Sequence, residues 1–413
     1  MITKPKGCYD VYGEDSKIYI TIQNIINNNM ELMNASYIRT PIFEASELFH
    51  RSVGETSDIV SKETYDFTDR SDRKLTLRPE NTASIVRSLI ENKIYANETN
   101  SVKLYYFGTM YRYERPQTGR NREFTQFGLE VFNCSNELVD AEVIASGAKI
   151  LNDLRIDATV RLNTLGDSET REKYIAALKE YIKPFLNDLC SDCQKRFENN
   201  PLRILDCKVD KDSEVFKGLP NINDYLSENA KIRFNNLKNY LTELEVDFIV
   251  DTNIVRGLDY YTDFVYEFTT EDGLVLGGGG RYDNLVENLG GPQMPATGYA
   301  LGIERLIIKI KEQELAEVNK LETFILAISS EEKFFGLKLL HNLRECGVGS
   351  EMCFNEASLK SQFKMADKLG SDFLILLNDE DLKKGLVTIK DNLLKTEEKV
   401  DESEVLEYLY EKM

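Results

Sequence analysis

The chain has 413 residues, of which 42% are hydrophobic, 29% are charged and only 9 are proline. This length predicts two or three domains, and the composition excludes a disordered chain, a collagen-like fibre and a membrane span, since no run of about 18 apolar residues occurs. The 51 Lys and Arg against 70 Asp and Glu give a net charge of -19, which argues against nucleic-acid binding unless basic residues are gathered locally.

The first residues and the cysteines predict a cytoplasmic protein. The polar start, residues 1–7, lacks the apolar core of a secretory signal. Seven cysteines, an odd number, fit free thiols better than a disulfide framework. Cys190, Cys193 and Cys207 lie close in sequence, but neither a second CxxC pair nor a nearby histidine completes a tetrahedral zinc site. We therefore expect no tightly bound metal.

The N-terminal part predicts a long helix, a strand and a hairpin. Apolar residues recur at helical spacing over residues 16–36, and residues 37–43 are typical of a strand interrupted by Pro41. Two aromatic-rich runs, 103–115 and 123–132, are separated by turn-forming residues and predict an antiparallel hairpin.

The rest of the chain predicts a helical insertion and a second domain. Residues 166–252 are rich in Lys and Glu and helically periodic, which indicates an insertion. Residues 259–268 are strand-like, and residues 302–310 have a helical pattern. After a charged stretch at 309–320, strands and helices alternate, so we expect an α/β domain from residue 321 to 413.

Charged side chains gather on one face of the predicted hairpin. Strand alternation places Arg112 and Glu114 on one face of the first strand, and Gln126 and Glu130 on one face of the second. Burying such a face against apolar residues is costly, so it either faces water or binds a polar ligand. On these residues alone both interpretations remain open.

Two weaker signals accompany the hairpin. The segment 76–82 supplies a carboxylate, Glu80, and a hydroxyl, Thr82, beside the turn set by Pro79. The run Gly277-Gly-Gly-Gly280 lets a ligand approach the backbone closely, although a glycine hairpin needs no ligand.

The motifs together resemble a known family. Arg112-Tyr-Glu-Arg115, Arg122-Glu-Phe124, Arg256-Gly-Leu-Asp-Tyr-Tyr261, Gly277-Gly-Gly-Gly-Arg-Tyr-Asp283 and Gly302-Ile-Glu-Arg305 occur in this order. In this order they resemble the class II aminoacyl-tRNA synthetases, and the motifs at residues 256–261 and 277–283 resemble the histidyl-tRNA synthetase family in particular. The likeness covers nearly the whole chain.

The resemblance implies an α+β catalytic domain at residues 1–320, built on an antiparallel sheet flanked by helices, with the insertion at about 166–252. Residues 37–43 with their preceding helix correspond to motif 1, a homodimer element; residues 107–132 and 298–310 correspond to motifs 2 and 3. Residues 321–413 resemble the anticodon-binding α/β domain. Residues 359–369 are predicted to form a helix. The basic residues that recur on it every four positions are the expected tRNA contacts: Lys360, Lys364 and Lys368.

The resemblance also implies the roles of the site residues. Arg112 and Arg305 hold ATP phosphates, and Glu114 lies near the adenine. Arg256 binds the α-phosphate and the carboxylate of the amino acid. Arg112 is also expected to contact the amino acid. The histidine-binding set implied by the family is completed by Glu130 and Tyr261 at the ring, and Glu80, Thr82, Gln126 and Tyr260 at the ammonium and carboxylate end.

The implied reaction explains the arginines. ATP activates L-histidine to histidyl-adenylate, and the histidine then passes to the 3' end of its tRNA. Bringing a carboxylate to an α-phosphate joins two anions, and fixed guanidinium groups oppose that repulsion. Mg²⁺ would accompany ATP as a bridge between phosphates.

Three residues depart from the family pattern: Asn81, Thr125 and Asp263. Thr125 stands where a histidine is usual, which puts nucleotide handling or transfer in doubt. The alternative function is the non-catalytic, histidine-sensing regulatory subunit of ATP phosphoribosyltransferase, which typically lacks an anticodon-binding domain.

Overall fold

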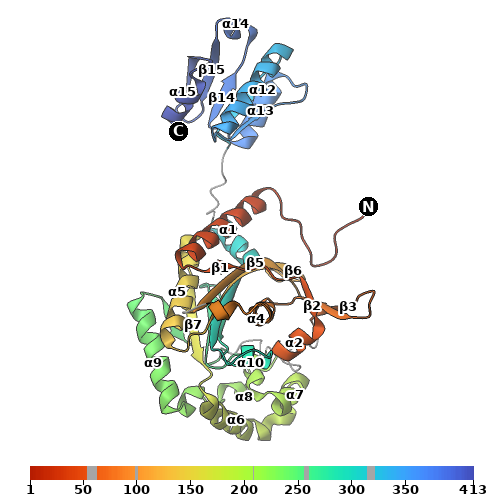
Figure 1. Cartoon of the computed structure of the whole chain (residues 1–413), viewed down its shortest axis with the longest axis vertical. Coiled ribbons are helices and arrows are strands. Elements are labelled where there is room, and N and C mark those ends of the chain that lie inside the picture. The colour runs from red at the N-terminus through yellow and green to blue at the C-terminus, as the bar shows by residue number, and fades with distance from the viewer. Residues whose placement is uncertain (54–62, 98–100, 208, 255–259, 314–320) are drawn as a thin grey trace. The chain divides into compact units, whose positions relative to one another are not determined.

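The computed structural model describes the chain except for residues 54–62, 98–100, 208, 255–259 and 314–320. The chain forms two compact units, Met1–Ala316 and Glu317–Met413 (Figure 1). Among the described residues the first unit has two sheets and the second has one, and each unit has its own apolar core.

The first unit combines helices with eleven strands among the described residues. Its helices are α1 (Glu14–Leu32), α2 (Ser46–Val53), α4 (Thr82–Glu91), α5 (Glu137–Asp153), α6 (Ser168–Ile182), α7 (Ser191–Asn199), α8 (Glu214–Lys217), α9 (Glu228–Glu243), α10 (Leu285–Asn288) and α11 (Ile303–Glu312), with 3-10 turns η1 (Ile94–Asn97), η2 (Lys183–Asp188), η3 (Pro201–Asp206) and η4 (Ile222–Tyr225). Its strands are β1 (Ser36–Tyr37), β2 (Phe43–Ala45), β3 (Tyr65–Thr68), β4 (Lys74–Leu77), β5 (Val102–Tyr111), β6 (Glu123–Phe132), β7 (Thr159–Thr164), β8 (Phe248–Val250), β9 (Phe264–Thr269), β10 (Val275–Arg281) and β11 (Ala296–Gly302).

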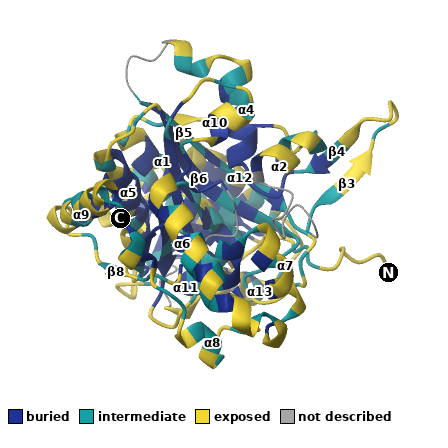
Figure 2. Cartoon of the chain, turned by 90° about the horizontal axis from the view of Figure 1, so that it is seen from below, coloured by how far each residue is buried: buried dark blue, intermediate teal, exposed yellow. Residues whose placement is uncertain are grey.

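An eight-stranded sheet forms the centre of this unit, in the order β1-β5-β6-β11-β10-β9-β7-β8. The pairs from β5 to β7 are antiparallel, and only the edge strands β1 and β8 pair in parallel. Apolar residues of α1, α5, α9 and α11 share one core with the sheet, and α4 and α10 contribute to another. Buried residues accordingly gather on the strands and inner helix faces (Figure 2). The predicted antiparallel sheet flanked by helices is confirmed.

The hairpin β5–β6 is confirmed, but its first strand ends earlier than predicted. The N–H of Arg112 still donates to the carbonyl of Arg122 at 2.9 Å. The N–H of Glu114 then donates to the carbonyl of Arg112 at 2.8 Å, which turns the chain, and Pro116 has no N–H to continue a ladder. Arg112 and Glu114 therefore lie in the loop and not on a strand face.

The strand predicted at residues 37–43 is wrong in its length. β1 ends at Tyr37, and β2 begins at Phe43 in a separate three-stranded sheet, β2-β4-β3. Between them, the carbonyl and hydroxyl of Thr40 accept hydrogen bonds from Nη1 of Arg78 at 3.1 and 3.0 Å, and Pro41 cannot donate to a strand. The segment therefore crosses from one sheet to the other.

Two further predicted elements differ in their bounds. The strand expected at 259–268 begins at Phe264, and residue 259 lies outside the described residues. Within residues 166–252 the helices α6, α7 and α8 pack around their own small core, whereas α9 packs against the core of the main sheet. The segment ends in β8, which pairs with β7 in the main sheet. The sequence pattern did not predict β8.

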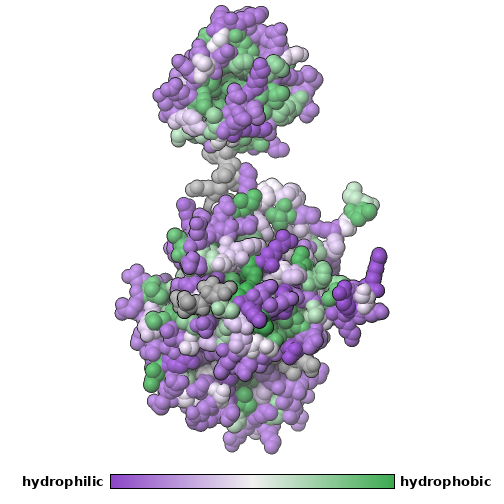
Figure 3. All heavy atoms as spheres, in the orientation of Figure 1, coloured by the Kyte–Doolittle hydropathy of each residue, from purple (hydrophilic) through white to green (hydrophobic). Residues whose placement is uncertain are grey.

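The second unit holds a five-stranded sheet in the order β13-β12-β14-β15-β16. Its elements are β12 (Thr323–Leu326), α12 (Ser330–Glu345), β13 (Ser350–Met352), α13 (Leu359–Leu369), β14 (Phe373–Leu376), α14 (Asp379–Leu382), β15 (Leu386–Asp391), β16 (Thr396–Asp401) and α15 (Val405–Lys412). The side chains of Lys360, Lys364 and Lys368 are exposed on α13. In both units the face seen in Figure 3 is mainly hydrophilic. None of the described helices is long and apolar enough to cross a membrane.

Candidate functional site

A cavity of about 370 Å³ lies in the first unit, against the hairpin and the glycine-rich strand β10. Its lining includes nine of the predicted site residues: Glu80, Thr82, Arg112, Glu114, Gln126, Glu130, Tyr260, Tyr261 and Arg305. Arg256 falls in the segment 255–259, outside the described residues, so its role stays a prediction. Segments far apart in the sequence thus meet in one cavity.

Glu130 is the buried acid of this cavity, with 2% of its surface exposed. Its Oε1 accepts a 2.6 Å hydrogen bond from the hydroxyl of Thr82, and its Oε2 accepts one from the hydroxyl of Tyr282. Gly298 faces Glu130 across β6 and β11, and a Cβ there would overlap the carboxylate. Burial raises the pKa of Glu130 to about 8, although both hydrogen bonds oppose the shift.

This pKa predicts a pH-dependent stability. Folded Glu130 keeps its proton up to about pH 8, whereas the unfolded chain releases it near pH 4.5, so folding takes up a proton between these values. The free energy of unfolding of the ligand-free protein should therefore fall as pH rises through this window. Glu130→Gln, which cannot titrate, should remove about 3 to 5 kcal/mol of that fall, measured by urea unfolding from pH 5 to 8. Parallel pH profiles for the two proteins would contradict the assignment.

Glu80 lies at the start of helix α4, beside Glu130. Its carboxylate accepts hydrogen bonds from the N–H groups of Thr82 and Ala83 at 2.6 and 3.0 Å, so it satisfies donors that the first turn leaves unpaired. Burial raises its pKa, and the backbone bonds and the charge of Arg112 oppose that. Two buried carboxyl groups thus occupy one end of the cavity.

Tyrosine rings enclose this acidic end. The rings of Tyr260 and Tyr261 lie 4.8 Å apart between centroids, and Tyr260 meets Tyr282 edge-on at 5.4 Å. Tyr106 packs opposite Gly128, where a Cβ would overlap its ring. The result is an enclosed pocket with carboxyl and hydroxyl groups, suited to a small ligand that carries hydrogen-bond donors.

Cationic side chains occupy the other end of the cavity. Nε of Arg112 donates to the carbonyl of Pro79 at 2.8 Å, and its guanidinium lies 5.2 Å from the ring centre of Phe124. Glu114 pairs with Arg112 at 3.9 Å and with Arg120 at 3.6 Å. The planar groups of Arg112 and Phe124 together form a charged and aromatic surface that fits a nucleotide.

Arg305 projects from the first turn of α11 into the same end. Its Nε donates to the carbonyl of Gly119 at 3.2 Å, and its Nη1 donates to the carbonyl of Val275. Arg305 thereby joins the loop after β5 to the first residue of β10. The neighbouring Glu304 accepts hydrogen bonds from the N–H of Thr125 at 2.6 Å and from the hydroxyl of Tyr9.

Two of the three departures from the family pattern have structural roles next to the cavity. Asn81 precedes α4, and its Oδ1 accepts hydrogen bonds from the hydroxyl of Thr40 at 2.7 Å and from Arg78 at 3.2 Å. Thr125 does not line the cavity, whereas its neighbours Phe124 and Gln126 do, because adjacent strand residues face opposite ways.

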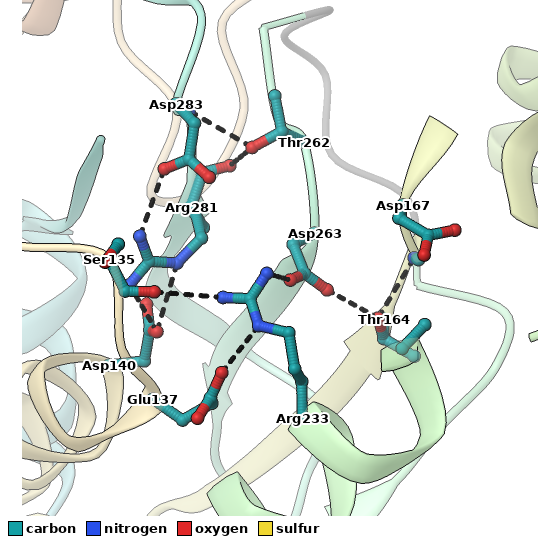
Figure 4. Close-up of polar contacts among 12 residues, drawn as sticks. Ser135, Glu137, Asp140, Thr164, Asp167, Arg233, Thr262, Asp263, Arg281 and Asp283 are labelled. Atoms are coloured by element: carbon teal, nitrogen blue, oxygen red, sulfur yellow. Dashed lines mark hydrogen bonds and ion pairs between the residues drawn. The ribbon is translucent and has the colours of Figure 1, made fainter. Parts of the chain in front are cut away.

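Asp263, the third departure, joins the insertion to the segment that carries the tyrosines. It pairs with Arg233 of α9 at 2.8 Å and accepts a 3.0 Å hydrogen bond from the hydroxyl of Thr164 (Figure 4). Burial raises its pKa to about 6, and the charge of Arg233 opposes the shift. In the same network, the buried Arg281 binds Asp140 at 2.5 Å, which fixes the end of β10.

Sequence reasoning missed several residues of the cavity. Tyr282 lies inside the quoted glycine motif, so its place in that motif was an available signal. Arg203 of η3 and Tyr106 also line the cavity, but neither has a motif of its own. Lys360, Lys364 and Lys368 belong to the second unit.

Comparisons with known proteins agree over the whole chain. The histidyl-tRNA synthetase family model matches residues 10–306, and an anticodon-binding domain model matches residues 322–412. The histidine–tRNA ligase of Staphylococcus haemolyticus is 40% identical over 421 residues, which is 100% of both chains. That of Bacillus velezensis is 43% identical over 94% of this chain and 93% of the relative. The crystal structure of apo Staphylococcus aureus histidyl-tRNA synthetase has a TM-score of 0.82 and 35% identity, and covers 99% of this chain and 100% of that one.

Proposed function

Because the chain belongs to the histidyl-tRNA synthetase family, we propose that its cavity activates L-histidine with ATP and passes the histidine to tRNA. The observation that carries this proposal is the polarity of the cavity. Along β6 the buried carboxyl and tyrosine groups lie toward Glu130, and Arg112 and Arg305 lie toward the loop after β5. The reaction of an amino acid with a nucleoside triphosphate needs a pocket for the amino acid next to cationic groups for the phosphates.

At the acidic end, histidine is read by its ring and held by its ammonium group. An imidazole ring has two nitrogens, and a site that pairs both rejects apolar side chains strongly. In this proposal Glu130 and Tyr261 meet the ring. Glu80, Thr82 and Gln126 meet the ammonium and carboxylate end, with Tyr260 beside them.

At the cationic end, Arg112 and Arg305 bind the phosphates of ATP, and Glu114 lies toward the adenine. The histidine carboxylate attacks the α-phosphate, pyrophosphate leaves, and the arginines stabilise charge on the phosphoryl oxygens. Arg256 is assigned to the α-phosphate and the attacking carboxylate. Glu267 of the lining offers carboxylate oxygens, the ligands that Mg²⁺ prefers, and the ion would neutralise phosphate charge when ATP is bound.

The alternative function is not supported. A regulatory subunit of ATP phosphoribosyltransferase typically lacks an anticodon-binding domain, whereas residues 322–412 match one. The curated relatives that cover the whole chain are named as histidine–tRNA ligases.

We place the tRNA contact of the second unit on α13. The side chains of Lys360, Lys364 and Lys368 are exposed at four-residue spacing and so form one basic stripe in an acidic protein. Replacing all three by alanine should weaken tRNA binding and lower the dependence of the binding constant on salt by about 1 per lysine. Filter binding between 50 and 200 mM salt would measure this, with pyrophosphate exchange unchanged.

The control removes the same charge elsewhere in the unit, from the exposed Lys383, Lys384 and Lys395. It should bind tRNA almost normally. If both triple variants lose the same affinity, α13 has no particular part in tRNA binding.

We also propose a homodimer in the cytoplasm. The segment that corresponds to motif 1 exposes large apolar side chains, Tyr37, Ile42 and Phe43. A second copy of the chain would cover them, as the resemblance implies for this element. The seven cysteines are free, which suits a reducing compartment.

Charging of tRNA tests the proposed function as a whole. The purified protein should attach histidine, and no other amino acid, to the histidine-accepting tRNA in the presence of ATP and Mg²⁺. A folded protein that binds histidine but charges no tRNA would contradict the proposal.

A further inference from the structure

The insertion contains a cluster of three cysteines and one aspartate that lies apart from the cavity lining. Cys190 precedes α7 as its N-cap, Cys193 lies in the first turn of that helix, Cys207 follows η3, and Asp210 lies in the next turn. One sulfur from each cysteine and one carboxylate oxygen all lie within 4.8 Å of one another. Cys193 and Cys207 are buried, and Cys190 and Asp210 are half-buried.

The separations within the cluster fit a tetrahedral ion. The sulfurs of Cys190 and Cys207 are 3.7 Å apart, and two sulfurs bound at 2.3 Å to one tetrahedral zinc ion would be about 3.8 Å apart. Sγ of Cys207 lies 3.4 Å from Oδ2 of Asp210, against about 3.5 Å for a sulfur and an oxygen on the same ion. A single ion can therefore reach these ligands without moving them far.

Backbone groups around the cluster suit negatively charged ligands. The N–H of Asp210 donates to the sulfur of Cys207 at 3.3 Å, and the N–H of Cys190 donates to Oδ2 of Asp210 at 3.0 Å. Such donors orient and stabilise thiolate and carboxylate ligands in metal sites. Cys190 and Cys193 also lie at the N-terminal end of the nine-residue helix α7, where the peptide dipoles favour a thiolate.

We propose that Cys190, Cys193, Cys207 and Asp210 bind one structural zinc ion. Three thiolates and one carboxylate in a closed tetrahedral set select zinc over magnesium or calcium, which take oxygen ligands only. This differs from the expectation drawn from the sequence, which found only three of the four ligands and therefore no metal site. The sequence does not reveal Asp210, because a lone aspartate has no metal signature until the turn after η3 brings it to the cysteines.

The loop between the ligands carries a residue of the cavity. Cys193 and Cys207 bracket the end of α7 and the turn η3, and η3 carries Arg203, which lines the cavity. Nη1 of Arg196 on α7 also donates to the carbonyl of Arg203 at 3.1 Å. Zinc would close this loop at both ends beside Arg203 of the cavity wall.

The experiment measures zinc in the full-length protein, purified without chelators and with its thiols reduced. We expect inductively coupled plasma mass spectrometry to find about one zinc ion per chain, and less than about a tenth of that in Cys193→Ser and Cys207→Ser. Cys346→Ser and Cys353→Ser are the controls, because these cysteines belong to the second unit, and they should keep the ion. Replacement by Co²⁺ should give the intense visible bands and thiolate charge-transfer band of a tetrahedral sulfur site.

Two outcomes would overturn the proposal. One is a folded wild-type protein with reduced thiols that holds no more zinc than Cys193→Ser and shows no thiolate band with Co²⁺. The other is full zinc content in both ligand variants, which would place the ion elsewhere. If the ligand variants do not fold, the zinc content and Co²⁺ spectrum of the wild type still decide the question.

Discussion

Replacing Arg112 by alanine should lower histidine-dependent pyrophosphate exchange by about 10² to 10³, or roughly 3 to 4 kcal/mol of transition-state stabilisation. Arg112 is held in place by the carbonyl of Pro79 and by Phe124, so in its proposed role the guanidinium would meet the phosphates without a cost of reorganisation. Its charge matters most as negative charge builds on the phosphoryl oxygens. Histidine binding, measured by calorimetry without ATP, should change much less than the rate of exchange.

Two variants sharpen this prediction. Arg112→Lys keeps the charge but loses the planar pair of donors, so it should recover only part of the rate. Arg87→Ala removes an arginine that pairs with Glu44 and Glu91 and does not line the cavity, and it should exchange almost normally. Near-normal exchange by Arg112→Ala would show that this arginine does not act on the phosphates.

Replacing Glu130 by alanine should weaken histidine binding by about 1 to 3 kcal/mol, or 5- to 150-fold, with little effect on ATP. If Glu130 reads the ring as proposed, the change would leave a nitrogen of the imidazole without a partner. It also strands the hydroxyl groups of Thr82 and Tyr282, which both donate to this carboxylate. Separate titrations with histidine and with ATP measure the two effects.

Glu114→Ala is the matched contrast, because this carboxylate lies at the cationic end of the same cavity. It should weaken ATP more than histidine. If both variants weaken both ligands equally, Glu130 has a general structural role and does not read the histidine ring.

The parts of the fold that depend on local sequence could be predicted. Alternating aromatic residues define the hairpin, and helical periodicity defines α1, α11 and α13 within a few residues of their ends. The predicted first strand of the hairpin ran past Tyr111 because its alternation continues into the loop, where Arg112 and Glu114 face the cavity instead of a strand neighbour. Strand β8 is only three residues long, so it leaves no periodic signal.

The contacts that complete the site could not be predicted, since they join residues far apart in the chain. Tyr282 binds Glu130 across 152 positions, and Arg233 reaches Asp263 from a different element. Arg203 meets the cavity only because the insertion folds against it. Asp210 could not be predicted as the fourth proposed ligand either, because only the turn after η3 brings it to the cysteines and the sequence has no pattern for that turn.

The exchange of labelled pyrophosphate into ATP tests the central claim most directly, because it reports adenylate formation without tRNA. The purified protein should catalyse exchange with histidine and with no other amino acid, and Arg112→Ala should abolish most of it. A folded protein that binds histidine measurably but supports no exchange would contradict the account and would favour a histidine sensor.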